Sequence, residues 1–333
     1  MISPTLCLYD QYKIEYENFV KNKGKFKYES KAQRVEYKSS VASLLYYEST
    51  VKNASEIFLI VPSIFNSPEI FFLSKKNNFI DNLLLSNDVY MINWQDHDKR
   101  IVIEDLVCEV EKIIIYLATK HKKKINLIGH CIGGNFCIAV AQNNFRNYLN
   151  SLSLLTVPWD FTHLTKYVQA QEILGFRGII KNINTVPRLY IRMMFFLMFP
   201  MQFKDKINKY FKLSAESKKF FLEIECWLQS GISISKSLYE EIIDNFCLYN
   251  ASFEKKWSVN NEIVDLKNIG VPTCIVHALE DQIVPYSSII PLRREIKNAA
   301  LIKVKGGHIN YLINPQPAFQ KEYSDWLREA GKG

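Results

Sequence analysis

Near the middle of the chain stands the stretch Ile125-Asn-Leu-Ile-Gly-His-Cys-Ile-Gly-Gly134. It begins with a mostly apolar run typical of a buried strand, and a helical pattern follows it. Between the two, Gly129, Cys131 and Gly133 match a G-x-S-x-G nucleophile elbow in which cysteine replaces serine. The stretch therefore predicts a sharp strand-to-helix turn that presents the thiol of Cys131 as a nucleophile.

Strand and helix patterns alternate on both sides of this turn. Apolar runs predict strands near residues 57–61, 89–94, 125–128, 152–157, 272–277 and 301–304. Helical spacing predicts helices between them, including one over 70–85, and residues 160–260 are helical in character. Such alternation is typical of a mostly parallel sheet flanked by helices, an α/β fold. We expect a core formed by residues 35–159 and 261–333, a helical cap inserted at 160–260, and an N-terminal extension at 1–34 that forms a surface helix.

Composition excludes several classes of protein. The 333 residues include 21 Phe, 18 Tyr and 5 Trp, which is far more aromatic surface than a disordered chain carries. The formal net charge of +8 suits a small anionic substrate or an acidic surface. Over this length it is too small to predict nucleic-acid binding. The longest apolar run, Met193–Met201, is too short for a transmembrane helix.

The number and spacing of the cysteines and histidines indicate the cellular compartment and whether a metal site is expected. The 7 Cys are odd in number and lack the spacing of a disulfide framework. Free thiols are typical of a reducing compartment, which predicts a cytoplasmic protein. The Cys and His residues show no spacing typical of zinc ligands, so we expect no metal and no cofactor.

The remaining members of a catalytic triad are expected downstream of the nucleophile, with the acid before the base. Asp281 follows the strand pattern at 272–277, and active sites of α/β proteins gather at the carboxyl ends of strands. His308 follows two glycines after the strand pattern at 301–304, on a loop able to reach the elbow. We therefore predict a triad of Cys131, Asp281 and His308.

Backbone amides are expected to stabilise the oxyanion that such a nucleophile creates. The N–H of Ile132, at the start of the helix, is one expected donor, and the helix N-terminus also favours negative charge. The second is expected from the loop after the strand at 57–61. In that loop Ser63, Ile64 and Phe65 each offer an amide, and we take Ile64 as the candidate.

Several of these residues have alternative interpretations. Cys131 could be a buried structural cysteine in a tight turn. Glu280 and Asp160 compete with Asp281 for the role of the acid. His130 adjoins the nucleophile, but adjacent side chains diverge at an elbow, so we expect it to pack or to contact substrate. Asn66 is expected to brace its loop or to contact substrate.

These motifs resemble those of the polyhydroxyalkanoate synthases, most closely the short class III catalytic subunit, within the α/β-hydrolase superfamily. Residues 129–134 resemble the family's cysteine-containing lipase box, and residues 61–66 and 89–94 resemble its early sheet. Residues 264–285 are similar to its approach to the catalytic Asp, and residues 306–309 to its His loop. The likeness extends from about residue 33 to the C-terminus.

The resemblance implies an α/β-hydrolase fold with a cap and a specific chemistry. Cys131 would be the acylated nucleophile and His308 its base, while Asp281 would orient His308 or help to deprotonate the incoming hydroxyl. The family polymerises (R)-3-hydroxyacyl-CoA, here expected to be 3-hydroxybutyryl-CoA, into a polyester with release of CoA. It also implies a homodimer, a small second subunit and a location at the polymer granule surface.

Two other functions stay open at this point. One is a cysteine-dependent thioesterase or esterase on the same scaffold, and the other is a catalytically silent protein that binds the granule surface. The cap also has an excess of cations, with eight Lys and Arg and one acid, Asp205, between Arg177 and Lys212. These cations could bind the phosphates of CoA or an anionic surface, or they could form an ordinary solvated helix face.

Overall fold

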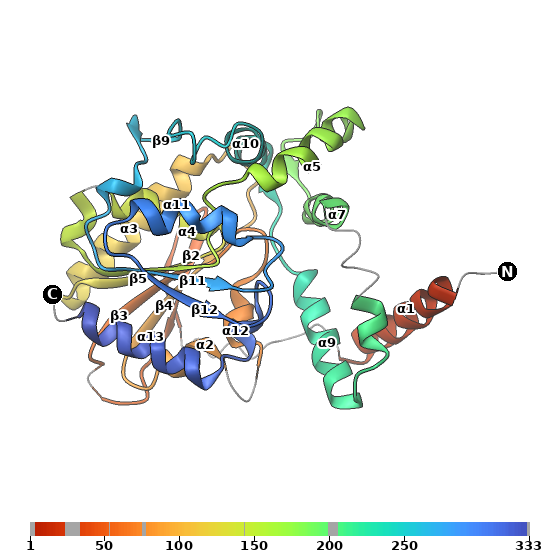
Figure 1. The fold of residues 1–333 in the computed structure, drawn as a ribbon, viewed down its shortest axis with the longest axis horizontal. Coiled ribbons are helices and arrows are strands. Elements are labelled where there is room, and N and C mark those ends of the chain that lie inside the picture. The colour runs from red at the N-terminus through yellow and green to blue at the C-terminus, as the bar shows by residue number, and fades with distance from the viewer. Residues whose placement is uncertain are drawn as a thin grey trace.

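The chain folds around an eight-stranded sheet in the order β1-β2-β4-β3-β5-β6-β11-β12 (Figure 1). This computed structural model describes residues 4–23, 34–52, 54–74, 78–142, 144–198 and 206–331. The strands are β1 (Arg34–Lys38), β2 (Ala42–Tyr47), β3 (Ile57–Val61), β4 (Asp88–Trp94), β5 (Ile125–His130), β6 (Leu149–Leu155), β11 (Thr273–Ala278) and β12 (Ala300–Val304). From β4 to β12 all neighbours are parallel, whereas β1, β2 and β4 pair in antiparallel fashion. The predicted α/β fold with a mostly parallel sheet is confirmed.

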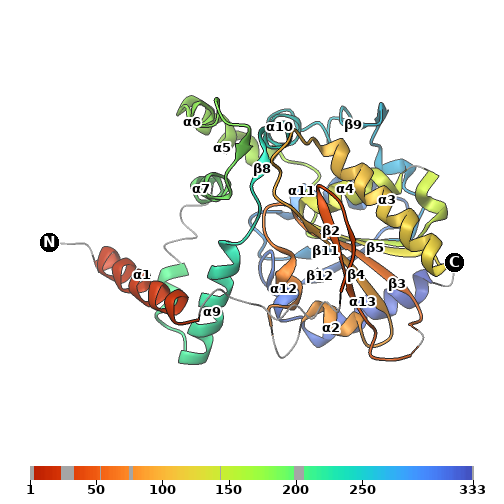
Figure 2. The same ribbon diagram turned by 180° about the vertical axis from the view of Figure 1, so that it is seen from behind.

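Both faces of the sheet are buried, which is why its central strands are continuous apolar runs. In β3, Leu59 and Val61 belong to one hydrophobic cluster, while Phe58 and Ile60 belong to another on the opposite face. Helices α3 (Ile103–His121), α4 (Ile132–Ala141) and α11 (Tyr286–Glu295) cover the first face. Helices α2 (Phe79–Leu83), α12 (Asn310–Ile313) and α13 (Pro317–Ala330) cover the second (Figures 1 and 2).

The continuous helix predicted over 70–85 is wrong. The structure has a short 3₁₀ helix, η1 (Pro68–Phe72), and then the separate helix α2. Asn78 starts α2 as its N-cap, because its side chain accepts a hydrogen bond from the Asp81 N–H at 2.9 Å. The apolar spacing was therefore produced by two short elements whose buried residues face the same side of the sheet.

Residues between β6 and β11 form mostly short helices. They are α5 (Thr162–Ile173), α6 (Phe176–Ile179), α7 (Arg188–Met198), α9 (Ala215–Leu228), α10 (Lys236–Glu241) and the π-helical turn η3 (Ile242–Leu248). Between them, the two-residue strands β7 (Thr185–Val186) and β8 (Ile234–Ser235) pair with each other, as do β9 (Ser258–Val259) and β10 (Glu262–Ile263). Short 3₁₀ turns η2 (Asn144–Asn147) and η4 (Leu266–Asn268) belong to the sheet-bearing core.

The N-terminal helix α1 (Pro4–Lys23) lies against α9, to the side of the sheet (Figures 1 and 2). Tyr12 of α1 shares a small hydrophobic cluster with Ile207, Tyr210 and Leu222. The Tyr12 hydroxyl donates to the buried carboxylate of Glu225 at 3.1 Å. We call α1 together with residues 206–228 the cap lobe. None of the helices described is both long and apolar enough to cross a bilayer.

Candidate active site

Cys131 occupies the turn between β5 and α4, where the sequence predicted an elbow. Its backbone has φ 51° and ψ −133°, a conformation that costs energy in a residue with a side chain. The turn is held by hydrogen bonds from the Cys131 N–H to the Leu155 carbonyl at 3.0 Å and from the Gly134 N–H to the Cys131 carbonyl at 2.9 Å. The strained turn leaves Cys131 partly exposed at the N-terminus of α4.

Two glycines allow the elbow to pack this tightly. A Cβ atom on Gly133 would lie 2.4 Å from the Pro62 carbonyl oxygen, and one on Gly134 would lie 2.1 Å from a methyl carbon of Val157. Neither gap accommodates a carbon atom, so α4 can approach the backbone of Pro62 and the side chain of Val157 this closely only with glycine at both positions. The same packing brings the loop after β3 alongside the elbow.

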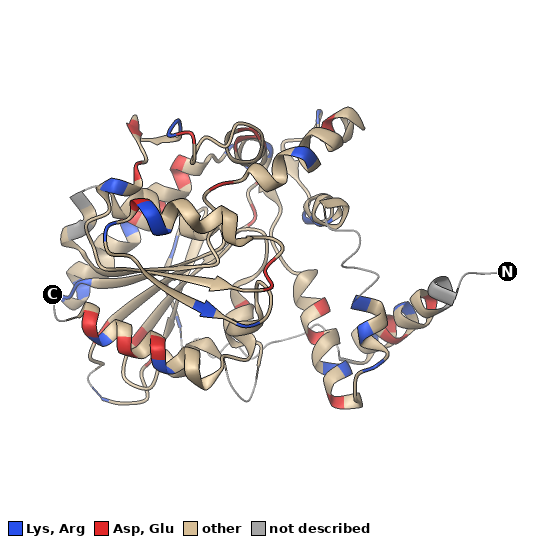
Figure 3. Cartoon of the chain, in the orientation of Figure 1, with Lys and Arg blue, Asp and Glu red and all other residues tan. Residues whose placement is uncertain are grey.

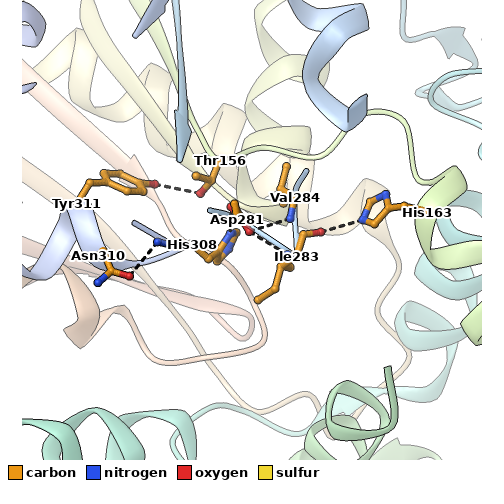
Figure 4. A network of polar contacts seen from close by, with 9 residues as sticks. Thr156, His163, Asp281, Ile283, Val284, His308, Asn310 and Tyr311 are labelled. Carbon is orange, nitrogen blue, oxygen red and sulfur yellow. Dashed lines mark hydrogen bonds and ion pairs between the residues drawn. The ribbon is translucent and has the colours of Figure 1, made fainter. Parts of the chain in front are cut away.

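Asp281 and His308 form a hydrogen-bonded pair next to the elbow (Figure 4). The His308 Nδ1 donates to Oδ2 of Asp281 at 2.7 Å. The other oxygen of Asp281 accepts from the backbone N–H groups of Ile283 and Val284, each at 2.9 Å. With its side chain fully buried and both oxygens engaged, Asp281 is fixed as a hydrogen-bond acceptor that selects one tautomer of His308.

The His308 ring also lies near the thiol of Cys131: both residues line the same cavity, and the thiol influences the pKa of the imidazole. Burial alone would lower the pKa of His308, but Asp281 and Cys131 together raise it to about 10. An imidazole that favours its charged form in this position can accept the thiol proton and stabilise a thiolate. The structure thus brings together Cys131, His308 and Asp281, the three residues predicted as a triad.

The two competing acids lie elsewhere. Glu280 is exposed to solvent. Asp160 accepts hydrogen bonds from the backbone and hydroxyl of Thr162 at 2.9 and 2.6 Å and from Asn250 at 2.9 Å, which stabilises the first turn of α5. Of the three carboxylates considered, Asp281 is the one that contacts His308.

The predicted oxyanion donors border the elbow. Ile132 is the first residue of α4, where N–H groups have no partner within the helix. In the loop after β3, the Phe65 N–H donates to the Ser63 hydroxyl at 3.3 Å. The Ile64 side chain is buried in the core beneath the loop, so only its backbone could serve the site. The roles of Ile132 and Ile64 stay predictions.

His130 is buried beside the triad, with 3% of its surface exposed. Its ring lies 5.3 Å from the His308 ring and 5.5 Å from that of Phe71, between centroids. Burial, reinforced by His308, holds the pKa of His130 well below its usual range, so the ring is neutral. His130 therefore forms part of the apolar packing around His308, and its edge lines the cavity described below.

Thr156 and Tyr311 belong to the site, although the sequence analysis did not identify them. The two hydroxyl groups are 3.0 Å apart and buried, and burial raises the pKa of Tyr311 well above its usual range (Figure 4). The charges of Asp281 and Cys131 raise it further, which places this neutral phenol close to both. The sequence offered one signal: Thr156 lies near the end of the strand pattern at 152–157 and directly follows β6, at the edge where the triad gathers.

A cavity of about 510 Å³ opens over Cys131, between the core and the cap. Its core side includes Pro62, Ser63, His130, Cys131 and His308, and its cap side includes Arg188, Arg192, Phe195, Trp227 and Gln229. Asn66 also lines it, but the Asn66 side-chain amide donates to the carbonyl groups of Leu228 and Ser230 at 3.5 and 3.4 Å. Asn66 thus braces its loop against the end of α9. Within the described residues, no three His, Cys, Asp or Glu side chains cluster as metal ligands would.

The curated proteins to which the chain is similar here carry the same name. The chain is 23% identical over 314 residues to the poly(3-hydroxyalkanoate) polymerase subunit PhaC of Haloferax mediterranei, covering 89% of this chain and 63% of that one. It is 24% identical over 315 residues to the protein of the same name from Synechocystis, covering 88% and 83%. The chain therefore spans less than two thirds of the first relative. The predicted resemblance to this family is confirmed.

Solved structures and a family profile define the fold. A hydrolase from Pseudomonas aeruginosa superimposes with a TM-score of 0.57 at 13% identity, covering 88% of this chain and 97% of that one. At that identity the likeness bears on the fold alone. The profile described as alpha/beta hydrolase fold matches residues 88–315, which include Cys131, Asp281 and His308. The chain belongs to the α/β hydrolase fold family.

Proposed function

We propose that this chain is an acyltransferase that polymerises (R)-3-hydroxyacyl-CoA, with 3-hydroxybutyryl-CoA as the expected monomer, into polyhydroxyalkanoate. The observation that carries the proposal is the cysteine elbow with its hydrogen-bonded His308 and Asp281. The similarity to PhaC proteins over most of the chain supports the same conclusion. Cys131, His308 and Asp281 are the proposed catalytic residues.

In the first proposed step, the sulfur of Cys131 attacks the carbonyl carbon of the acyl thioester. The bond between that carbon and the CoA sulfur breaks, and His308 gives the thiol proton of Cys131 to the departing CoA thiolate. The N–H groups of Ile132 and of the loop at 63–65 are the proposed donors to the oxyanion. One thioester replaces another, so the acyl group keeps its activation.

In the second proposed step, the hydroxyl oxygen of another hydroxyacyl unit attacks the acyl-cysteine carbon. His308, held by Asp281, takes the hydroxyl proton, an ester bond forms, and the Cys131 sulfur leaves as a thiolate. A serine ester would have lost the free energy that drives this step. The chemistry therefore explains why cysteine stands at the position that serine occupies in most elbows.

Water would convert the same intermediate into a free acid. The cap side of the cavity supports its exclusion, because Phe195 packs against Phe65 with ring centroids 5.4 Å apart and Trp227 adds a further apolar wall. Trp227 is fixed there by a hydrogen bond from its indole N–H to the Ser67 carbonyl at 2.8 Å. Such an apolar wall limits the access of water to the intermediate, which favours attack by a bound hydroxyl over attack by solvent.

Mass spectrometry of the intact protein after exposure to 3-hydroxybutyryl-CoA tests this proposal. The expected result is a hydroxyacyl adduct on the peptide that contains Cys131, release of CoA, and an insoluble polyester. Cys137, which is buried in α4, provides the matched control: Cys137→Ala should retain the adduct and Cys131→Ala should lose it. Release of free 3-hydroxybutyrate without polymer would instead identify a thioesterase, and an unmodified protein that releases no CoA would exclude both enzymes.

The oligomeric state and location remain part of the proposal. A homodimer, a small second subunit and attachment to the polymer granule surface follow from the family resemblance. Native mass spectrometry of the protein purified from its own cells would detect either partner. A monomer that polymerises the substrate at full rate would exclude a need for both.

A further inference from the structure

One face of α7 forms part of the cavity wall. Arg188, Arg192 and Phe195 lie at positions i, i+4 and i+7, a spacing that places them along one side of a helix, and all three line the cavity. Phe195 contacts Phe65 in the loop beside the elbow. Since a helix rises 1.5 Å per residue, Arg192 and Arg188 lie about 5 and 10 Å further along the axis. The cavity therefore has an apolar part near Cys131 and a cationic part beyond it.

The cationic part is not neutralised by the acid next to it. Glu225, the acidic residue among those lining the cavity, is 4% exposed and accepts the hydroxyl of Tyr12 while pairing with Lys206. In the part of the chain that the structure describes, no carboxylate forms an ion pair with Arg188 or Arg192.

Other cations near this part of the chain already form ion pairs with carboxylates. Arg177 pairs with Glu172 and Asp244 away from the cavity. In the cap lobe, Lys218 pairs with Glu15, and Figure 3 shows charges of both signs on α1 and α9. An excess of positive charge is thus found where α7 borders the cavity.

The rim near Arg192 is built from three helices. Arg192 on α7 lies close enough to Tyr16 on α1 for its charge to lower the pKa of that phenol, although burial dominates and raises it. Tyr16 in turn accepts a hydrogen bond from Gln229, which follows α9 and lines the cavity. Arg192 is therefore positioned at the meeting point of α1, α7 and α9.

We propose that Arg188 and Arg192 form an anion subsite that binds the phosphate groups of a thioester substrate whose acyl carbon lies at Cys131. Guanidinium groups suit phosphate because their parallel N–H donors match two phosphate oxygens. Arg188 is the first residue of α7, where the helix dipole adds to the attraction, and Arg192 follows one turn later. The inference rests on the proposed function, because it assigns the site that recognises the leaving group of that reaction.

Paired substrates test the subsite. Acylation of Cys131 is measured with 3-hydroxybutyryl-CoA and with the N-acetylcysteamine thioester of the same acid, which has no phosphate. A phosphopantetheine thioester, which has one phosphate, should give an intermediate KM. For R188Q and R192Q we expect the KM for the CoA ester to rise about 10-fold, and for the double variant about 100-fold, which is 1.4 kcal/mol per tenfold. In the double variant, the KM for the CoA ester should therefore approach the KM for the N-acetylcysteamine ester, because the phosphate groups no longer contribute to binding.

K181Q is the matched control, because Lys181 is an exposed cation of the cap that does not line the cavity. It should leave the KM for the CoA ester within twofold. Binding of CoA itself to Cys131→Ala, with and without the arginine changes, gives a second readout that needs no turnover.

The results separate this inference from the proposed function. Equal KM values for the CoA and N-acetylcysteamine esters in the wild type would overturn the subsite while leaving the acyltransferase intact. Arginine variants that raise the KM for both esters by the same factor would also overturn the subsite. If neither ester acylates the wild type, both the function and the subsite are overturned.

Discussion

The elbow region and the cap lobe are stabilised in different ways. Around Cys131, strands buried on both faces and close contacts at Gly133 and Gly134 leave almost no freedom. The cap lobe has a small cluster of its own, in which Tyr12 and Tyr210 donate to Glu225 and Glu15 at 3.1 and 2.5 Å. The comparison indicates that the chemistry depends on a rigid frame of apolar packing, whereas the cap lobe is held by a small apolar cluster and a few buried or half-buried polar contacts. Changes in the first region should abolish activity or folding, and those in the second should have small, local effects.

The largest effect is expected from Cys131→Ala. Removing the sulfur eliminates the covalent step, so CoA release should fall by about 10⁴-fold or more, while the unfolding midpoint in urea should change little. A coupled assay of free CoA measures the first quantity. CoA release at the wild-type rate would refute the assignment of the nucleophile.

Asp281→Asn should have the next largest effect. The carboxylate that selects the tautomer of His308 and stabilises its charge would become a neutral amide, so acylation of Cys131 should slow by about 10³-fold. Asp160→Asn is the control, because Asp160 interacts with Thr162 and Asn250 instead. Stopped-flow measurement of CoA release compares the two variants, and equal rates would contradict the proposed triad.

Gly133→Ala tests the tight packing of the elbow. The added carbon would lie 2.4 Å from the Pro62 carbonyl oxygen, and because that atom belongs to the backbone, the change should reduce the free energy of unfolding by about 3 kcal/mol. In the cap, a carbon added at Gly178 would have no atom within 4 Å, so Gly178→Ala should alter stability by less than about 1 kcal/mol. Urea unfolding would measure both changes in stability, and equal losses would show that Gly133 is packed no more tightly than Gly178 on the exposed helix α6.

The His308 pair predicts a pH dependence of stability. The pKa of His308 is raised from 6.5 to about 10 in the folded protein, so its protonation favours folding. This contribution is full below about pH 6.5 and disappears as the pH rises through 10. The difference in free energy of unfolding between the wild type and His308→Gln should therefore shrink by roughly 2 kcal/mol from pH 6 to pH 10. Urea titrations at both pH values check this, and a difference that grows with pH would contradict the buried ion pair.

The smallest effect is expected in the cap lobe. Tyr12→Phe removes the hydroxyl that donates to Glu225, but Lys206 still pairs with that carboxylate, so the cost should be about 1 kcal/mol. Hydrogen exchange should accelerate in α1 and α9 and stay unchanged in α4. Faster exchange in α4 as well would mean that the lobe and the elbow unfold together.

The elbow region was also the easier one to predict from sequence. Buried strands such as β3 are continuous apolar runs, and the order of Cys131, Asp281 and His308 follows from where those strands end. Local patterns sufficed for these strands because each is specified by its own residues. They did not suffice for the helix predicted at 70–85, where the side chain of Asn78 starts a new helix within a continuous apolar pattern. The pairing of Thr156 with Tyr311 escaped notice, since two hydroxyl groups 155 residues apart have no signature in the sequence.

The cap resisted the same approach for a physical reason. The surface helix expected in the N-terminal extension exists as α1, but its partner α9 could not be predicted. Their contact depends on Tyr12 and Glu225, which are 213 positions apart. Contacts of this kind depend on how distant segments pack in the folded protein, and the periodicity of apolar residues along the sequence does not predict that packing.

The position of α1 has a consequence for biosynthesis. At about 5–20 residues per second, the ribosome needs roughly 10 to 40 s to reach Glu225 after Tyr12 has been made. During that interval the apolar face of α1 has no partner on its own chain, so it is available to chaperones or to neighbouring nascent chains. A label or fusion attached ahead of α1 should therefore lower the yield of protein with an assembled cap lobe more than it lowers the reactivity of Cys131 in the protein that does fold.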